Sequence, residues 1–111
     1  MKRTALRRTR PRPWHRDASD RVTDALANYL YARDDASCRA PMLARMHGEP
    51  IDACQGRLTI EHVKTESMMG KRAPSDRAHT MLLCLYHNVG WALTHKTWER
   101  EYLALVEGTA R

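Results

Sequence analysis

The sequence lacks phenylalanine altogether and has no long apolar run. None of its 111 residues is phenylalanine. Nowhere do about 18 apolar residues follow one another, which excludes a membrane-spanning helix. The basic N-terminus is also not followed by the apolar stretch that a secretory signal needs. We therefore expect a cytoplasmic protein of one small domain, with no membrane partner.

Cysteine is scarce as well, with three residues in the chain. An odd number argues against a framework of disulfides, and a reducing compartment would keep these thiols free. A chain of this size buries a limited core and often needs a staple, which inside cells is usually a structural zinc ion. Metal ligation is therefore the use of cysteine to test.

Acidic residues are absent from the first 16 positions, which hold seven of the nineteen Lys and Arg residues. The other twelve bases and the thirteen acids nearly cancel, so the formal charge of +6 comes from the N-terminus. Pro11, Pro13 and the lack of apolar periodicity predict a disordered basic arm over residues 1–17. Such an arm suits phosphate contacts with DNA; the alternatives are a solvated tail and an arm that binds an acidic protein.

Apolar spacing and turn residues predict the elements of a single domain over residues 18–111. We expect a helix over 19–33 with Ser19 as its N-cap, and its apolar face consists of Val22, Leu26, Tyr29 and Leu30. The later elements are an irregular loop over 38–54 with its ends pinned together, strands over 57–63 and 79–84, a helix over 87–95, and a last helix over 97–107. Thr97 is the expected cap of this last helix, Gly108 its end, and its apolar face consists of Trp98, Tyr102, Leu105 and Val106.

One candidate ligand set combines all three cysteines with a histidine: Cys38, Cys54, Cys84 and His87. The Cys-x2-His spacing of the last two lets ligands from one turn reach the same ion, and zinc prefers four such ligands in a tetrahedron. The first two cysteines are separated by fifteen intervening residues, which is wider than in a zinc knuckle. Taken alone, the cysteines could equally be small buried residues, and His87 a core or surface histidine.

A second candidate set consists of Glu61, His62, His79 and Asn88. Carboxylate and amide oxygens are hard ligands that suit Mg²⁺ or Mn²⁺ and leave positions for phosphate and water. A neutral imidazole beside them can take a proton from the attacking water. The set is suited to hydrolysis of a phosphodiester, although an acid-histidine dipeptide is common and is usually incidental.

The stretches CQGRLTIEHV, GKRAPSDRAHTMLLCLYHN and GWALTH resemble the HNH nuclease family, and the likeness spans about residues 38–102. Within this family it resembles small phage-encoded HNH endonucleases with a structural zinc. The resemblance implies an α+β fold, with a small ββα-metal core over 57–95, flanking helices and the basic N-terminal arm.

Matched position by position, the resemblance makes His62 the general base and Glu61 a ligand of the catalytic Mg²⁺ or Mn²⁺. His79 stands where the middle asparagine of the motif is usual, and its implied role is to orient the loop and the backbone or ring of His62. Asn88 replaces the last histidine, as in an HNN variant whose asparagine oxygen holds the ion. The four residues of the structural zinc positions are Cys38, Cys54, Cys84 and His87.

The function implied is a metal-dependent DNA endonuclease, encoded by a phage or mobile element and acting in the host cytoplasm by nicking or beside packaging or recombination proteins. The alternatives are a catalytically inactive, zinc-stabilised DNA-binding module and an adaptor whose arm docks on an acidic partner. The expected phosphate-contacting residues are Lys2, Arg3, Arg7, Arg8, Arg10, Arg12, Lys64, Lys71, Arg72 and Arg77.

His95 has two interpretations. It lies two helical turns after Asn88 and could be an extra ligand, but a helix-terminal histidine that contacts the last carbonyls or a DNA phosphate is the favoured alternative. Trp91, Trp98 and Tyr102 are expected to be core residues rather than a platform for stacking bases.

Overall fold

The computed structural model describes residues 21–65 and 72–108. The predicted arm over 1–17 and Lys71 lie outside these ranges, so the arm residues expected to contact phosphate are not placed. The elements in chain order are α1 (Asp24–Arg33), α2 (Ala40–Met46), β1 (Leu58–His62), the 3₁₀ turn η3 (Arg77–His79), β2 (Thr80–Cys84), the π-helix η4 (His87–Trp91), α3 (Ala92–Thr94) and α4 (Lys96–Glu107).

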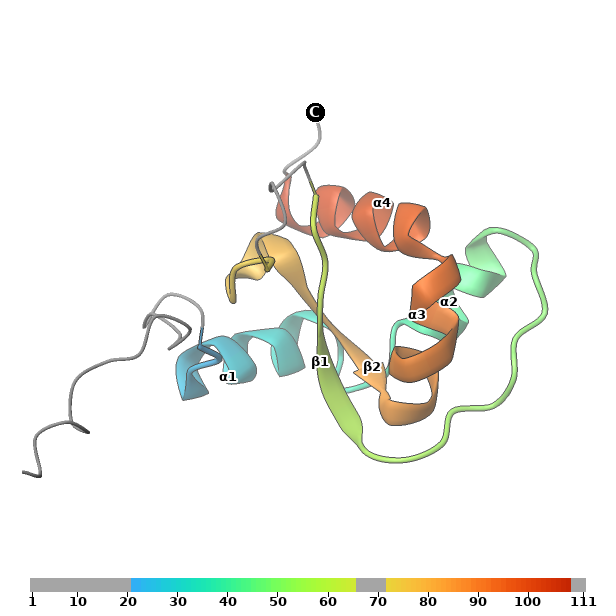
Figure 1. Cartoon of the computed structure of the whole chain (residues 1–111), viewed down its shortest axis with the longest axis horizontal. Helices are drawn as coiled ribbons and strands as arrows, with labels where there is room; N and C mark the ends of the chain where they lie inside the picture. Colours follow the sequence, from blue (N-terminus) through green and yellow to red (C-terminus); the bar gives the residue numbers. More distant parts are fainter. Residues whose placement is uncertain (1–20, 66–71, 109–111) are drawn as a thin grey trace, which may run out of the picture.

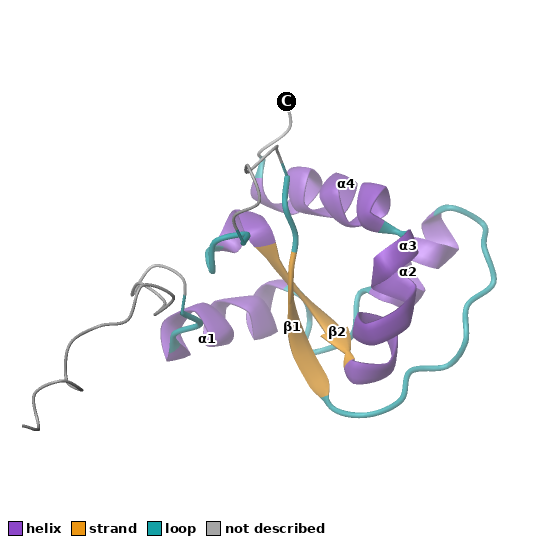
Figure 2. Cartoon of the chain, in the orientation of Figure 1, coloured by secondary structure: helices purple, strands orange, loops and turns teal. Residues whose placement is uncertain are grey.

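The fold is α+β, with one small antiparallel sheet among the helices. Strands β1 and β2 pair from Leu58 opposite Cys84 to His62 opposite Thr80. Every residue of β2 is buried, so this strand is the centre of the domain. The helices surround the two strands, with α1 and α4 on different sides of the pair (Figures 1 and 2). The two expected strands and their pairing are confirmed.

The two faces of the sheet pack against different helices. On one face, Leu82 of β2 joins Leu26 and Leu30 of α1 in a small buried cluster. On the other, Met81 and Leu83 belong to a larger cluster that extends to α2, α3 and α4. Alternate residues of a strand point to opposite faces, which is why neighbours in β2 belong to different clusters.

The first helix begins later than its apolar spacing predicts. Thr23, not Ser19, is the N-cap, and its hydroxyl accepts a hydrogen bond of 3.1 Å from the Leu26 amide. Val22 precedes the helix and is exposed, so it does not belong to the apolar face. The expectation of a helix from residue 19 is therefore wrong at its start, because residues 21–23 are not helical and Thr23 caps the helix.

The segment between Cys38 and Cys54 is not irregular throughout, as the sequence led us to expect. Seven of its residues form α2, and Pro41 lies in the first turn, where its missing N–H costs nothing. Residues 47–57 then run as an extended loop around the outside of α2 and α3 to β1 (Figure 1). Turn residues that we took for loop signals are thus compatible with a short helix.

The predicted helices after β2 exist with different boundaries. The first is divided into η4 and α3, and α4 begins at Lys96, so Thr97 lies inside the helix rather than at its cap. Gly108 ends α4 in the left-handed region at φ +67°, as expected. Leu105 is 70% exposed and is not part of the apolar face, whereas Leu103 is fully buried.

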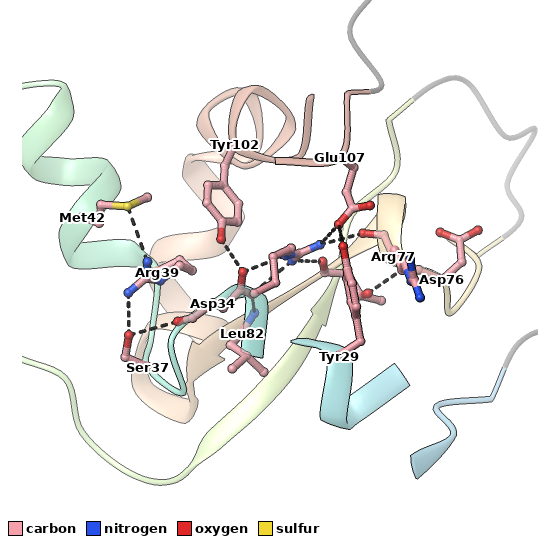
Figure 3. A network of polar contacts seen from close by, with 12 residues as sticks. Tyr29, Asp34, Ser37, Arg39, Met42, Asp76, Arg77, Leu82, Tyr102 and Glu107 are labelled. Atoms are coloured by element: carbon pink, nitrogen blue, oxygen red, sulfur yellow. Dashed lines mark hydrogen bonds and ion pairs between the residues drawn. The ribbon is translucent and has the colours of Figure 1, made fainter. Parts of the chain in front are cut away.

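A buried carboxylate joins three elements of the fold. Asp34, which follows α1, accepts a hydrogen bond of 2.9 Å from the Leu82 amide of β2 and one from the Tyr102 hydroxyl of α4 (Figure 3). Its charge is balanced by Arg33, whose Nε lies 2.8 Å away. Arg33 also reaches Glu107 at 3.0 Å, so a second ion pair joins α1 to the end of α4.

Loss of this carboxylate should destabilise the domain strongly. We expect Asp34→Ala to lower the free energy of unfolding by about 3 to 5 kcal/mol, because it leaves a buried cation and two donors without their acceptor. Tyr102→Phe should cost about 1 kcal/mol, since it removes one hydrogen bond. Urea denaturation of the metal-loaded protein measures both, with the exposed Tyr31→Phe as the matched control. Equal stability of Asp34→Ala and wild type would contradict this role.

Candidate functional site

Cys38, Cys54, Cys84 and His87 come together in space. Their ligand atoms lie within 4.8 Å of one another. The Nδ1 atom of His87 lies 3.5, 3.7 and 3.2 Å from the sulfurs of Cys38, Cys54 and Cys84. In a tetrahedral zinc site, ligand bonds of 2.0 to 2.3 Å place nitrogen and sulfur about 3.5 Å apart. The group could therefore hold a metal ion such as zinc.

Backbone hydrogen bonds bring these distant stretches together. The Arg39 amide donates to the Leu82 carbonyl at 3.0 Å and thereby holds Cys38 beside β2. The Tyr86 amide donates to the Gln55 carbonyl at 3.1 Å, which places Cys54 against the turn after Cys84. Gly56, the residue after Gln55, adopts a φ of +85°, and a Cβ at this position would lie 3.1 Å from the Leu85 Cβ. A glycine is required at this close approach.

The imidazole of His87 is oriented for ligation through Nδ1. Its other nitrogen, Nε2, lies 3.0 Å from the Asp52 carbonyl oxygen, which can only accept. The proton therefore belongs on Nε2, and Nδ1 keeps its lone pair. This carbonyl contact is the outer-shell support that metal-binding histidines commonly have.

Burial and hydrogen bonds act on the thiols in opposite directions. Burial raises the pKa of Cys38 to about 12 and also raises that of Cys54. At Cys84 burial is outweighed by backbone hydrogen bonds from His87 and Gln55, which lower the pKa. Cys84 is therefore the thiol that most readily becomes the thiolate that a metal binds.

We expect the purified chain to contain one zinc ion per molecule. The His87→Ala variant should contain no zinc, and its thermal unfolding should no longer be a cooperative transition. The physical reason is that metal binding at a four-ligand site is folding free energy for a small domain. Metal analysis and thermal denaturation with and without a chelator measure this. His47→Ala, on an exposed histidine that stacks on Trp98, is the matched control and should keep its zinc. Full zinc content in His87→Ala would contradict this assignment.

On the face of β1 that points toward α4, two glutamates lie around one lysine. Glu61 Oε2 is 2.5 Å from the Lys96 ammonium, and Glu99 Oε1 is 3.5 Å from the same nitrogen. Glu99 is completely buried and neither of its oxygens has a hydrogen bond. Burial and the neighbouring Glu61 carboxylate raise the pKa of Glu99 to about 8.

Sequence reasoning singled out Glu61 but missed Glu99 and Lys96. The signal was present, because Glu99, Tyr102 and Leu103 are the buried residues of α4 and follow the i, i+3, i+4 pattern of one face. A glutamate on the buried face of a helix is uncommon unless it has a partner.

The other candidate catalytic residues lie in two places. The Asn88 side-chain amide donates a hydrogen bond of 2.7 Å to the Thr59 hydroxyl. Thr59 lies two residues before Glu61 in β1, so both side chains are on the same face of the strand. His62 points to the opposite face, where its Nε2 lies 2.8 Å from the Ser75 hydroxyl. The structure thus brings Asn88 to the Glu61 side of β1 and sends His62 to the loop before η3.

His79 is held by two side chains and lies beside the end of β1. Its Nδ1 is 2.7 Å from Asp76 Oδ1, and its Nε2 is 3.0 Å from the Thr65 hydroxyl. Its carbonyl accepts a hydrogen bond of 2.8 Å from the amide of Val63, the residue after His62. His79 therefore contacts the backbone next to His62 through its own backbone.

His95 contacts a helix carbonyl rather than the Asn88 side chain. Its Nδ1 lies 2.8 Å from the Trp91 carbonyl oxygen, and its ring stacks on the Trp91 indole. Trp91 and Trp98 pack against the core and Tyr102 is buried within it, as expected. His95 also lines a cavity of about 560 Å³ beside His87, which none of the four candidate catalytic residues lines.

Lys64 and Arg72 are exposed, as a phosphate contact requires. Arg77 is exposed too, although its guanidinium lies over the Tyr29 ring at 3.9 Å. Within residues 21–65 and 72–108, no helix has the length and apolar character to cross a membrane. No family model, no curated protein and no solved structure matches the chain.

The buried Glu99 should make stability depend on pH. An unfolded glutamate ionises near pH 4.5 but folded Glu99 keeps its proton until about pH 8, so its contribution to stability is present at acid pH and is lost as the pH rises between these values. We expect Glu99→Gln to be increasingly more stable than wild type from pH 6 to 8. Urea denaturation of both zinc-loaded proteins measures this difference, in which other titrations cancel. A difference that stays constant with pH would contradict it.

Proposed function

We propose that the chain is a metal-dependent DNA endonuclease of the HNH type, with a ββα-metal core and a structural zinc. The observation that carries the proposal is the arrangement of the two candidate sets. The Cys3His group surrounds the turn from β2 to η4. Asn88 beside it binds Thr59, which lies on the same face of β1 as Glu61, two residues before it. An order of strand, strand and helix with acid-histidine at the end of the first strand is what the HNH resemblance implies.

In this proposal the structural zinc is held by Cys38, Cys54, Cys84 and His87 and fixes the start of η4. Asn88 is the next residue, so the ion determines where its amide lies. Glu61 and the Asn88 oxygen would hold a catalytic Mg²⁺ or Mn²⁺. When bound, such an ion would stabilise the negative charge that develops on the phosphate and on the leaving oxygen.

His62 is the general base of the proposed reaction. The Ser75 hydroxyl lies 2.8 Å from its Nε2, which is the separation a general base needs from the water it deprotonates. If a DNA phosphate bound beside Ser75, the water that attacks it could lie within hydrogen-bond distance of His62 Nε2. His79 is the positioning residue, since its carbonyl fixes Val63 and its ring is held by Asp76 and Thr65.

DNA is the proposed partner through its phosphates. Exposed Lys64 and Arg72 support this among the described residues. The seven bases of the N-terminal 16 residues would add contacts that weaken with salt. A phage or mobile-element setting, with packaging or recombination proteins as partners, belongs to the same proposal.

A zinc-stabilised DNA-binding module without catalysis is the second candidate. The observation that favours it is that Glu61 already has a cationic partner and that the protein already holds the Asn88 side chain through its amide nitrogen. Glu61 is ion-paired with Lys96 at 2.5 Å, and the Asn88 amide is bonded to Thr59 at 2.7 Å.

The deciding experiment is nicking of supercoiled plasmid in low salt by zinc-loaded wild type and His62→Ala, with Mg²⁺, Mn²⁺ or EDTA. We expect nicking that needs the added ion, and a rate about 10² to 10⁴ times lower in His62→Ala, which is what a general base contributes. His47→Ala is the matched histidine control.

Zinc content and DNA affinity of each variant separate lost catalysis from lost folding. Nicking by His62→Ala at the wild-type rate would contradict its role as the base. Wild-type protein that binds zinc and DNA but cuts with neither ion would instead support the binding module.

A further inference from the structure

Glu99 is a buried carboxylate without adequate compensation. It is completely buried, and neither oxygen has a hydrogen bond. Buried polar atoms are almost always hydrogen-bonded, and an ionised carboxylate in the interior needs a paired charge. The nearest cation, Lys96, is 3.5 Å away and donates its hydrogen bond to Glu61 instead. A group left in this state calls for a ligand that the protein itself does not provide.

The Lys96 ammonium lies where a cation would touch both carboxylates. It forms ion pairs with both Glu61 and Glu99. One ammonium carries a single positive charge and can balance Glu61 while Glu99 keeps its proton. A divalent cation in its place would balance both carboxylates with Glu99 ionised.

The position is also accessible. The Lys96 side chain is 38% exposed, whereas that of Glu61 is 9% exposed and that of Glu99 is not exposed at all. A lysine on a flexible four-carbon stem can turn toward solvent without disturbing the core. The carboxylates are fixed by β1 and α4, so the site has rigid ligands and one movable occupant.

We propose that Glu99 and Glu61 together hold a divalent cation of the Mg²⁺ or Mn²⁺ class, and that Lys96 occupies this position when the ion is absent. Glu99 is thus a metal-ligating residue on α4, outside the stretches GRLTIEHV and CLYHN that supply the other candidate ligands. The proposal rests on the nuclease function for its purpose, because the ion would be the one that acts on the phosphate.

Two oxygen ligands of this kind suit a hard cation. Mg²⁺ and Mn²⁺ favour carboxylate oxygens and keep several waters, which leaves positions for phosphate. Asn88, bonded to Thr59 on the same strand face, can add a third oxygen. The thiolates of the Cys3His group prefer zinc, so the two sites discriminate between ions by ligand type.

The test is a titration of zinc-loaded, full-length protein with Mn²⁺. Binding is measured as the loss of the electron paramagnetic resonance signal of free Mn²⁺, and the zinc content of each sample is measured as well. We expect one Mn²⁺ per wild-type chain. Glu99→Gln should weaken binding by more than the roughly 10- to 100-fold that loss of an outer-shell partner costs. Glu101→Gln, an exposed glutamate on the same helix, is the matched control and should bind as wild type.

Lys96→Met gives a second and independent result. Because the ammonium competes with the ion, its removal should raise Mn²⁺ affinity, even if Glu99→Gln does not fold. Weaker binding by Lys96→Met would overturn the proposal. So would wild-type affinity in Glu99→Gln, or no binding by the wild type up to about 10 mM, beyond the millimolar range of weak hard-cation sites.

Failure of this site and failure of the proposed function are distinguishable. Mn²⁺ binding that depends on Glu99, in a protein that never nicks DNA, would keep the site and remove the nuclease. Nicking that needs Mn²⁺ and His62, with Mn²⁺ affinity unaffected by Glu99→Gln, would keep the nuclease and overturn the role of Glu99.

Discussion

The convergence of three thiols on one imidazole nitrogen is the constraint on which the rest of the molecule depends. Cys38 precedes α2, Cys54 precedes β1, and Cys84 and His87 flank the turn between β2 and η4. One ion at this point would therefore fix the long loop over 47–57, the start of the sheet and the start of the helical segment. A small chain that buries a limited core gains most from such a link between segments distant in sequence.

Helix α4 carries the second constraint, because it presents two buried polar residues one turn apart. Tyr102 binds Asp34, and this contact anchors the helix to the end of α1 and to β2. Glu99 is thereby held against the Glu61 face of β1, where its carboxylate cannot turn to solvent. The Asp34 carboxylate accepts hydrogen bonds from three elements and stabilises the fold, whereas the Glu99 carboxylate has an ion pair at 3.5 Å but no hydrogen bond and is the costlier of the two.

Sequence pattern predicted the parts of the fold that depend on local chemistry. The segment over 57–63 alternates and the segment over 79–84 is a short apolar run, and both form the expected strands. Gly108 ends α4 as its backbone freedom allows. Residue type and the Cys-x2-His spacing made Cys38, Cys54, Cys84 and His87 one candidate set, with small buried residues an equal alternative. The resemblance favoured the metal site, and the structure brings the four ligand atoms within 4.8 Å of one another.

The sequence pattern could not predict features that depend on a choice between two possible caps or on packing between distant segments. Ser19 and Thr23 are both good caps, and only the observed Thr23–Leu26 bond decides between them. Glu99 shares a helix face with Tyr102 and Leu103, but its approach to Glu61 follows only from the packing of α4 against β1, because these two carboxylates belong to different elements. His62 and Glu61 are adjacent in sequence, yet strand alternation sends them to opposite faces.

That separation determines how the proposed chemistry must be arranged. An ion held between Glu61 and Glu99 lies on the α4 face of β1, and the base nitrogen of His62 lies beside Ser75 on the other. A phosphodiester that uses both must therefore cross the end of β1, where the strand stops at His62 and Lys64 is exposed. A duplex backbone laid over this end would bring its phosphate oxygens to the ion and its water to the imidazole, with the strand terminus between the two groups.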